Sequence, residues 1–185
     1  MNTPVKELDH ELIEACRSND RGAQVRIYEM FSNTIFNTCV RIVDNSADAE
    51  DLMQESFIEA FRKIETFRGE GEFIGWLKRI AINNSINFIR KHKKLVSLDE
   101  SNLDIPDPYA GEEEISENIF CQLEEIKSAM DQLKANYKIV LSLHLLEGYD
   151  HDEIAEILGT SNGNVRTRYS RAKQKLLQII MHSRN

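Results

Sequence analysis

Apolar side chains recur at intervals of three and four positions through most of this sequence, the spacing that gathers them on one face of an α-helix. No stretch of useful length alternates apolar and polar residues, so the pattern predicts no β-strand. We therefore expect an all-α protein. Three apolar series mark helices in the first half: Ile27, Phe31, Ile35, Cys39 and Ile42, then Met53, Phe57, Ala60 and Ile64, and finally Phe73, Leu77, Ala81 and Phe88.

The first half of the chain is predicted to form a bundle of about four helices. Ser46 precedes an acidic stretch, residues 47–51, and we expect Ser46 to cap the amino end of a helix. Its hydroxyl would accept hydrogen bonds from free backbone N–H groups, and the acids that follow suit the helix dipole. Phe57, Phe61 and Phe88 are expected in the core of this bundle.

The last third of the sequence predicts further helices. The final two are expected over residues 150–158 and 162–180, joined by Gly159-Thr160-Ser161. Asp150 and Glu153 have the spacing of a capping box, in which each side chain bonds the backbone N–H of the other residue. Two helices joined by such a short turn predict a helix-turn-helix.

The net charge of −8 is concentrated in one segment. Residues 95–118 contain eight acidic side chains and no basic one, and Pro106 and Pro108 lie among them. This composition is typical of an extended linker, because like charges repel and proline disrupts helices. The sequence therefore predicts two small helical domains, residues 1–94 and 119–185, joined by an acidic linker over residues 95–118.

Both helical blocks contain a basic stretch that suits nucleic acid. Residues 62–94 hold nine basic and three acidic side chains, interleaved with Phe67, Phe73 and Trp76, and cations mixed with rings suit single-stranded DNA. Residues 163–185 hold six basic side chains and no acidic one, as a helix in a major groove requires. The polar members share helix faces: Arg79, Asn83, Asn87 and Arg90 in the first stretch, and Asn164, Arg168, Arg171 and Lys175 in the second.

The three cysteines, Cys16, Cys39 and Cys121, lie far apart, with no Cys-x-x-Cys pair and no histidine at ligand spacing. We therefore expect reduced, buried thiols in a cytoplasmic protein, and no metal site. Residues 1–12 carry four charged side chains, which argues against a secretory signal. No run of about 18 apolar residues predicts a membrane span.

Three motifs carry a family resemblance. Residues 49–57, which read AEDLMQESF, resemble the core-polymerase-binding helix of bacterial RNA polymerase sigma factors. Phe73, residues 76–83 and Arg90 resemble the segment of these factors that recognises and melts the promoter −10 element, and residues 153–159, 161–168 and 171–172 resemble their −35-reading helix-turn-helix. The motifs occur in the family's order. With two domains and a short linker, the chain is most similar to the extracytoplasmic-function (ECF) type.

The resemblance implies a protein that directs promoter-specific initiation by RNA polymerase, is not itself an enzyme, and needs no cofactor. Docking on the polymerase would involve Asp51, Gln54, Glu55 and Phe57. Recognition of the −10 element would involve Phe67, Arg68, Phe73, Trp76, Arg79, Asn83, Asn87 and Arg90. Recognition of the −35 element would involve Asn164, Arg166, Arg168, Arg171 and Lys173.

The partners implied by the resemblance are core RNA polymerase and promoter DNA, duplex at −35 and partly single-stranded at −10. The helices before Gly148 would bind the polymerase flap. Many factors of this type are sequestered by an anti-sigma protein, which makes such a protein a candidate partner. The family's linker is thought to occupy the RNA exit path, so we hypothesise that the acids of residues 95–118 mimic nucleic acid there.

Two other classes of protein account for parts of the sequence. A free-standing helix-turn-helix regulator would use its first block to sense a ligand or dimerise, but such a block has no need of the basic, aromatic residues 62–94. The dipeptide His151-Asp152, with His144 nearby, also occurs in metal phosphohydrolases. A helix-capping role for Asp150 explains this segment without a metal. DNA binding without polymerase would favour the first alternative, and bound metal the second.

Overall fold

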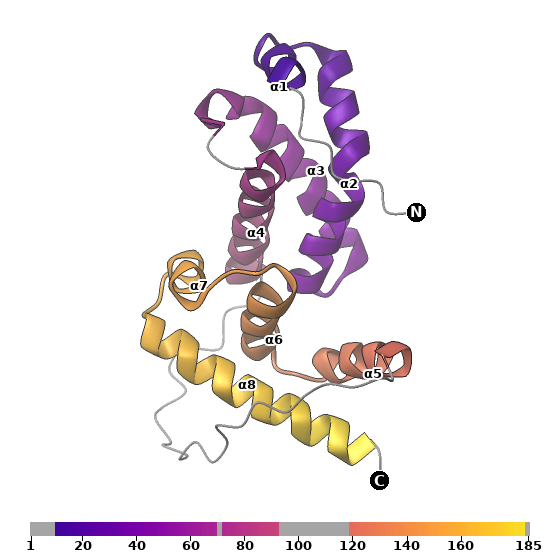
Figure 1. The fold of residues 1–185 in the computed structure, drawn as a ribbon, viewed down its shortest axis with the longest axis vertical. Coiled ribbons are helices and arrows are strands. Elements are labelled where there is room, and N and C mark those ends of the chain that lie inside the picture. Colours follow the sequence, from indigo (N-terminus) through magenta and orange to yellow (C-terminus); the bar gives the residue numbers. More distant parts are fainter. Residues whose placement is uncertain (1–9, 70–71, 93–118, 184–185) are drawn as a thin grey trace. The chain divides into compact units, whose positions relative to one another are not determined.

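The computed structural model describes residues 10–69, 72–92 and 119–183, and it falls into two compact units, Met1–His92 and Lys93–Asn185 (Figure 1). The described segments are helical and contain no β-strand, which confirms the all-α prediction. None of their helices has the length and hydropathy to cross a bilayer. The linker predicted over residues 95–118 lies outside the described residues.

The described residues of the first unit form four α-helices, in agreement with the predicted bundle of about four, and one turn of 3-10 helix that the sequence did not predict. Helices α2, α3 and α4 pack against one another, and Ile27, Ile35, Leu77 and Ile82 are fully buried between them. The elements are α1 (His10–Arg17), α2 (Arg21–Val43), α3 (Ser46–Arg62), η1 (Ile64–Thr66) and α4 (Phe73–His92).

Side-chain caps fix where α3 begins. The Oδ1 atom of Asn45 accepts hydrogen bonds from the backbone N–H groups of Ala47 and Asp48, at 2.9 and 3.1 Å. The prediction that Ser46 is the cap is therefore wrong by one residue. Asn45 has the extended backbone that a cap requires, whereas Ser46 is already helical.

The buried stripe of α4 is wider than the predicted series. Because α4 packs against both α2 and α3, its core face also includes Ile86 and Ile89. Phe88 lies at the edge of this face, half-buried and stacked on His92 with ring centroids 4.2 Å apart, so its predicted core position is wrong. Phe57 is buried as predicted, while Phe61 is half-buried.

The second unit is built around the long helix α8. Its core contains Met130, Leu133, Leu141 and Ala172. The elements are α5 (Ile119–Asp131), α6 (Ala135–Leu141), a π-helical turn η2 (Ser142–Leu146), α7 (His151–Leu158) and α8 (Asn162–Ser183). The apolar face of α8 packs on this core, since Val165 and Ala172 are buried and Tyr169, Leu176 and Ile179 are partly buried.

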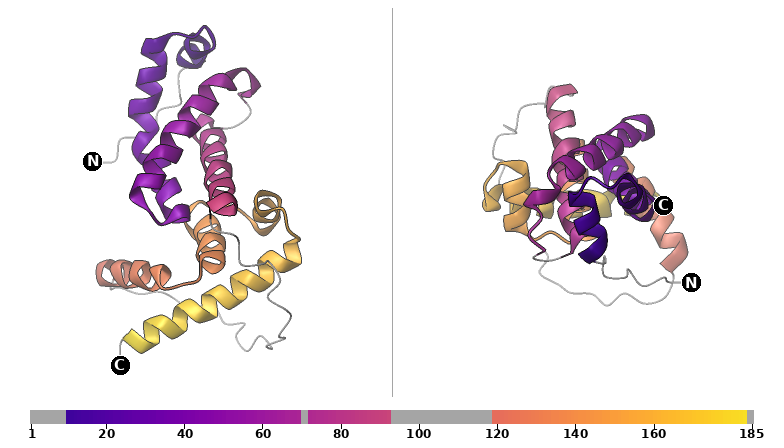
Figure 2. Two further views of the ribbon diagram at one scale, coloured as in Figure 1. Left: turned by 180° about the vertical axis from the view of Figure 1, so that it is seen from behind. Right: turned by 90° about the horizontal axis from the view of Figure 1, so that it is seen from above.

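Helices α7 and α8 form the predicted helix-turn-helix, which can be followed in Figures 1 and 2. Asp150 and Glu153 make the predicted capping box, in which the Asp150 carboxylate accepts from the Asp152 and Glu153 N–H groups, both at 2.8 Å. Gly159 ends α7 in the left-handed region at φ 62°, where a side chain would be strained. The turn that follows redirects the chain into α8.

Candidate nucleic-acid and polymerase interfaces

The polar face predicted for the −10 segment lies on α4. Asn83, Asn87 and Arg90 are exposed and Arg79 is half-buried, at the four- and three-residue spacing that aligns them along the helix. Asn84 has a different role, since its Nδ2 atom donates to the Ser56 hydroxyl of α3 at 3.3 Å. The structure therefore separates the amides that face outward from the one that joins two helices.

Three aromatic rings pack together where α4 begins. The ring centroid of Phe67 lies 5.4 Å from that of Phe73 and 5.5 Å from that of Trp76, and Phe73 and Trp76 are 5.4 Å apart. Phe67 and Phe73 are 5% and 4% exposed, whereas Trp76 is half-buried. The two phenylalanines are therefore buried, whereas Trp76 reaches the protein surface. They support the Trp76 ring from beneath, and neither of them presents a ring face to a ligand.

The backbone turns sharply beside these rings. Arg68 is exposed, and Gly69 adopts φ 74°, a conformation that other residues rarely tolerate. We refer to the three rings as the aromatic cluster (Phe67, Phe73 and Trp76).

The surface predicted for polymerase docking lies on α3. Asp51, Gln54 and Glu55 are exposed, while Phe57 is 3% exposed and belongs to the core beneath them. The exposed carboxylates make this face acidic. Ile58 is 52% exposed on the same helix.

An apolar groove borders this acidic surface, and sequence reasoning missed its α2 half. Val25 and Tyr28 of α2 line it opposite Ile58 of α3, and Val25 is 54% exposed. Both α2 residues fall outside the apolar series that forms the core. The presence of large apolar side chains outside the core series is the sequence signal that could have predicted the groove. The α2–α3 groove, as we call it, is lined by Arg21, Gln24, Val25, Tyr28, Gln54, Phe57, Ile58 and Phe61.

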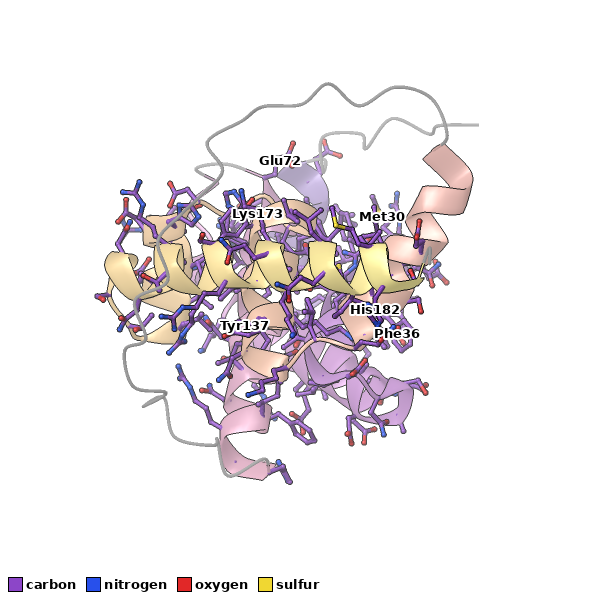
Figure 3. The ribbon with its side chains drawn as sticks, turned by 90° about the horizontal axis from the view of Figure 1, so that it is seen from below. Met30, Phe36, Glu72, Tyr137, Lys173 and His182 are labelled. Atoms are coloured by element: carbon purple, nitrogen blue, oxygen red, sulfur yellow. The ribbon has the colours of Figure 1, made fainter. Side chains whose placement is uncertain are left out.

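The residues predicted to read duplex DNA lie along α8, which crosses the view in Figure 3 with Lys173 and His182 labelled on it. Asn164, Arg166 and Lys173 are exposed, and Arg168 and Arg171 are half-buried. The Asn164 side chain donates to the Thr160 hydroxyl at 3.1 Å, at the start of the helix. No acidic residue occurs on α8, so every charged side chain on this helix is cationic.

An aromatic stack joins three elements of the second unit. The rings of His144 and His151 stack with centroids 4.8 Å apart, and the Tyr169 ring of α8 meets them edge-on at 4.6 and 5.1 Å. The Lys173 ammonium lies 5.1 Å from the Tyr169 ring centroid. A metal role was weighed for these histidines and set aside in favour of helix capping by Asp150, and the described parts of the chain hold no cluster of metal-ligating residues. The stack instead fixes α8 against η2 and α7.

The stack holds His151 where burial and neighbouring groups disfavour its protonation. Burial, followed by the neighbouring His144 and Arg166, lowers the pKa of His151 below its ordinary value of 6.5. Asp150 and Asp152 act in the opposite direction, but the lowering effects dominate. Because the unfolded chain then binds the proton more readily than the folded chain, protonation favours unfolding.

We therefore expect the second unit to lose stability as the pH falls below about 6.5. His151→Phe keeps a ring in the stack but removes the titrating group. In calorimetry of the full chain, the drop in melting temperature between about pH 7.5 and pH 5.5 should be smaller for this variant than for the unsubstituted chain. Equal drops in both proteins would contradict the prediction.

Two of the predicted buried thiols can be compared with the structure. Cys16 and Cys39 are buried and free, as expected. Burial raises the pKa of the Cys16 thiol, and the nearby Asp20 carboxylate adds to that effect. The side chain of Cys121 lies outside the described residues.

Comparison with known proteins matches both units. The family model for Sigma-70 region 2 matches residues 27–95, and the model for Sigma-70, region 4 matches residues 123–176. The ECF RNA polymerase sigma-E factor of Haemophilus influenzae is 31% identical over 177 residues, covering 91% of this chain and 93% of that protein. The ECF RNA polymerase sigma factor SigW of Bacillus subtilis is 30% identical over 172 residues, covering 89% and 92%.

A solved structure shares the fold. The sigma factor RpoE from Bartonella quintana, crystallised in complex with the anti-sigma factor NepR, matches with a TM-score of 0.56 and 20% identity over 84% of this chain and 95% of that one.

The helix-turn-helix with its cationic second helix, together with the aromatic and amide-bearing face of α4, defines a helical DNA-binding transcription factor. The chain belongs to the ECF-type RNA polymerase sigma factors. It directs promoter-specific transcription initiation with RNA polymerase. Family membership excludes the free-standing regulator considered above.

Proposed function

We propose that the two units divide promoter recognition between them, with residues 1–94 acting at the −10 element, residues 119–185 at the −35 element, and residues 95–118 linking them. The observation that carries this proposal is the alignment of Asn83, Asn87 and Arg90 on the exposed face of α4, next to the partly exposed ring of Trp76. Amides and guanidinium groups bond base edges and phosphates, while a ring stacks on an unpaired base.

In this proposal Trp76 holds a non-template base that has left the duplex. Extruding a base costs a few kcal/mol, which contacts with the protein must offset. Phe67 and Phe73 fix the Trp76 ring from below, and Arg68 lies beside the cluster where it can meet a phosphate. Arg79, Asn83, Asn87 and Arg90 extend the contact along α4.

The −35 element is read by α8 lying in the major groove. Arginine bonds guanine through two parallel hydrogen bonds, which makes Arg168 and Arg171 candidates for base contacts, and Asn164 can pair in the same way with adenine. Arg166 and Lys173, exposed on the same helix, are placed to anchor phosphates.

Core polymerase docks on α3 and the α2–α3 groove. The exposed acids Asp51 and Glu55 attract a basic partner surface, Gln54 offers hydrogen bonds, and Ile58 gives the contact an apolar centre. Phe57 contributes from the core by shaping the base of the groove. In the second unit, Leu145 and Leu146 are 54% and 47% exposed just before Gly148, and they are the apolar side chains available to a polymerase flap.

We further propose an anti-sigma protein as a regulatory partner, because a structurally similar sigma factor has been crystallised with one. The chain itself supplies no chemical step and no cofactor in this scheme. Its role is to bring core polymerase to a promoter and to stabilise the opened DNA.

Run-off transcription with core polymerase on fragments of the host bacterial genome tests the proposal. Asn83→Ala and Arg168→Ala should each lower initiation about five- to 150-fold at the selected promoter, as expected for one base contact worth roughly 1–3 kcal/mol. Arg26→Ala and Lys127→Ala remove exposed cations from the first and second unit outside these surfaces, and they should have little effect. Failure of the unsubstituted chain to stimulate initiation on any fragment would refute the proposal.

A further inference from the structure

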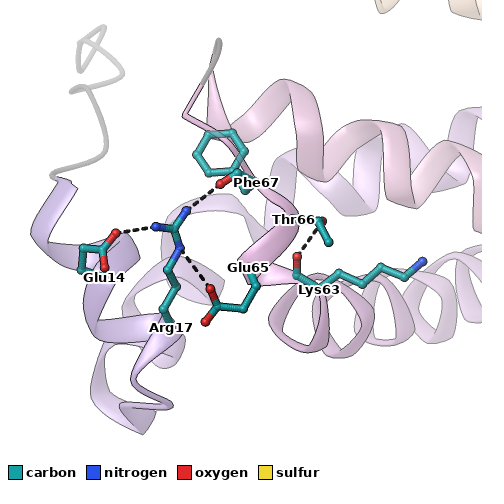
Figure 4. Close-up of polar contacts among 6 residues, drawn as sticks. All are labelled: Glu14, Arg17, Lys63, Glu65, Thr66 and Phe67. Atoms are coloured by element: carbon teal, nitrogen blue, oxygen red, sulfur yellow. Dashed lines mark hydrogen bonds and ion pairs between the residues drawn. The ribbon is translucent and has the colours of Figure 1, made fainter.

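Arg17, the last residue of α1, holds together segments that are far apart in the sequence (Figure 4). Its Nη2 atom donates to the backbone carbonyl oxygen of Phe67 at 2.6 Å, across 50 residues of sequence. Its Nη1 atom donates to the Glu14 carboxylate at 2.5 Å, and its Nε atom lies 4.0 Å from the Glu65 carboxylate.

The chemistry of arginine suits this junction. A guanidinium is a rigid planar fork that stays charged at every pH of interest, so it can serve several acceptors in one fixed geometry. The Arg17 side chain is 26% exposed, which shields these contacts partly from solvent. Glu14 comes from α1 and Glu65 from η1, so the two carboxylates orient the guanidinium that binds Phe67.

The carbonyl that Arg17 binds belongs to the residue on which the aromatic cluster depends. The Phe67 ring touches both Phe73 and Trp76, and it is buried. The backbone of Phe67 leaves η1 in an extended conformation, with Arg68 and the left-handed Gly69 directly after it. Fixing this one carbonyl therefore fixes the ring that supports Trp76 and the direction in which the chain continues.

We infer that Arg17 is a positioning residue for −10 recognition, acting on Trp76 through the Phe67 carbonyl and ring. This assigns α1 to the promoter-recognition machinery, although α1 precedes residues 27–95, the segment that matches sigma region 2. The inference rests on the proposed function, since it takes the surface at Trp76 to be the one that meets the −10 element.

The test measures discrimination between two promoters rather than total activity. The probes are the fragment selected by run-off transcription and the same fragment with its −10 element scrambled, each transcribed by holoenzyme. The readout is the ratio of the two initiation rates. A sigma factor that is merely less stable loses activity on both fragments and keeps the ratio, whereas a displaced −10 surface lowers it.

We expect Arg17→Ala to lower this ratio about tenfold, within the range for loss of a hydrogen bond from a charged group. Arg17→Lys keeps a cation that can reach one acceptor but lacks the planar guanidinium with its several donors. Its ratio should lie between those of the unsubstituted protein and Arg17→Ala. Arg26→Ala, an exposed arginine of the same unit, should leave the ratio unchanged. In the free full-length chain, acrylamide should quench the fluorescence of Trp76, the only tryptophan, more strongly in Arg17→Ala than in the unsubstituted protein.

The outcomes separate this inference from the proposed function. An unchanged ratio in a folded Arg17→Ala protein, with a lowered ratio in Asn83→Ala, overturns the inference and leaves the proposed function standing. Unchanged ratios in both variants refute the −10 assignment itself. If Arg17→Ala does not fold, the double variant Glu14→Gln/Glu65→Gln takes its place, because it leaves the guanidinium without its two carboxylates, and an unchanged ratio there overturns the inference.

Discussion

Replacing Ile58 by aspartate is expected to weaken binding of this sigma factor to core RNA polymerase about a hundredfold, the equivalent of roughly 2.7 kcal/mol. Ile58 is 52% exposed in the α2–α3 groove, so the free protein should accept the change without loss of stability. In the complex the new carboxylate would be taken out of water in an apolar contact beside Val25 and Tyr28, and burying a charge there costs binding free energy.

Titration of fluorescently labelled chain with core polymerase gives the affinity. Ile58→Ala should cost far less than Ile58→Asp, because it removes apolar contact without burying a charge. The matched control is Met30→Asp, since Met30 is 47% exposed on α2 but does not line the groove. Equal losses in Met30→Asp and Ile58→Asp would mean that charge, rather than the groove, governs binding, and unimpaired binding by Ile58→Asp would exclude the groove from the interface.

Most of the helical architecture could be predicted because the apolar period and the capping residues agree. The capping box of α7 was correct in detail, since Asp150 and Glu153 satisfy each other's backbone within four residues. The start of α3 was misplaced because Asn45 and Ser46 are both good caps, and only the backbone angles decide between them. The π-helical turn Ser142–Leu146 left no sequence signal, since its apolar run fits several helical registers.

The outward-facing residues of the two DNA surfaces were also predictable, because four-residue spacing alone aligns Asn83 with Asn87 on α4. Their surroundings were not. Burial of Phe67 and Phe73 depends on contacts between distant parts of the sequence, such as that of the Phe73 ring with Phe31 of α2, which no local pattern records. The contact from Arg17 to the Phe67 carbonyl joins residues 50 positions apart, and its chemistry appears only once the helices are placed in space.

The stack of His144, His151 and Tyr169 is a second set of contacts that the sequence alone could not predict. Sequence reasoning weighed the two histidines as metal ligands because they lie near an aspartate. In the structure their rings face each other and Tyr169, and the His151 Nε2 atom is buried without a hydrogen-bond partner among the described residues. The sequence thus drew attention to His144 and His151 as candidate metal ligands, whereas in the structure they pack against α8.

Trp76→Ala is expected to lower open-complex formation about five- to 150-fold, since stacking of one base on an aromatic ring contributes roughly 1–3 kcal/mol. The reason lies in the cluster: Phe67 and Phe73 both pack against the ring, with centroids 5.5 and 5.4 Å from it, so the ring loses little freedom when a base stacks on it. Alanine leaves the extruded base without this surface. Trp76→Phe keeps a ring and should retain most of the activity.

The decisive comparison uses two templates, a duplex promoter and the same promoter mismatched through its −10 element. On the mismatched template the DNA is already open, so the cost of extruding a base no longer falls on the protein. The defect of Trp76→Ala should therefore shrink to within about threefold there, whereas a variant that had lost core packing would be equally impaired on both templates. Equal impairment would assign Trp76 to the stability of the first unit and remove it from promoter melting.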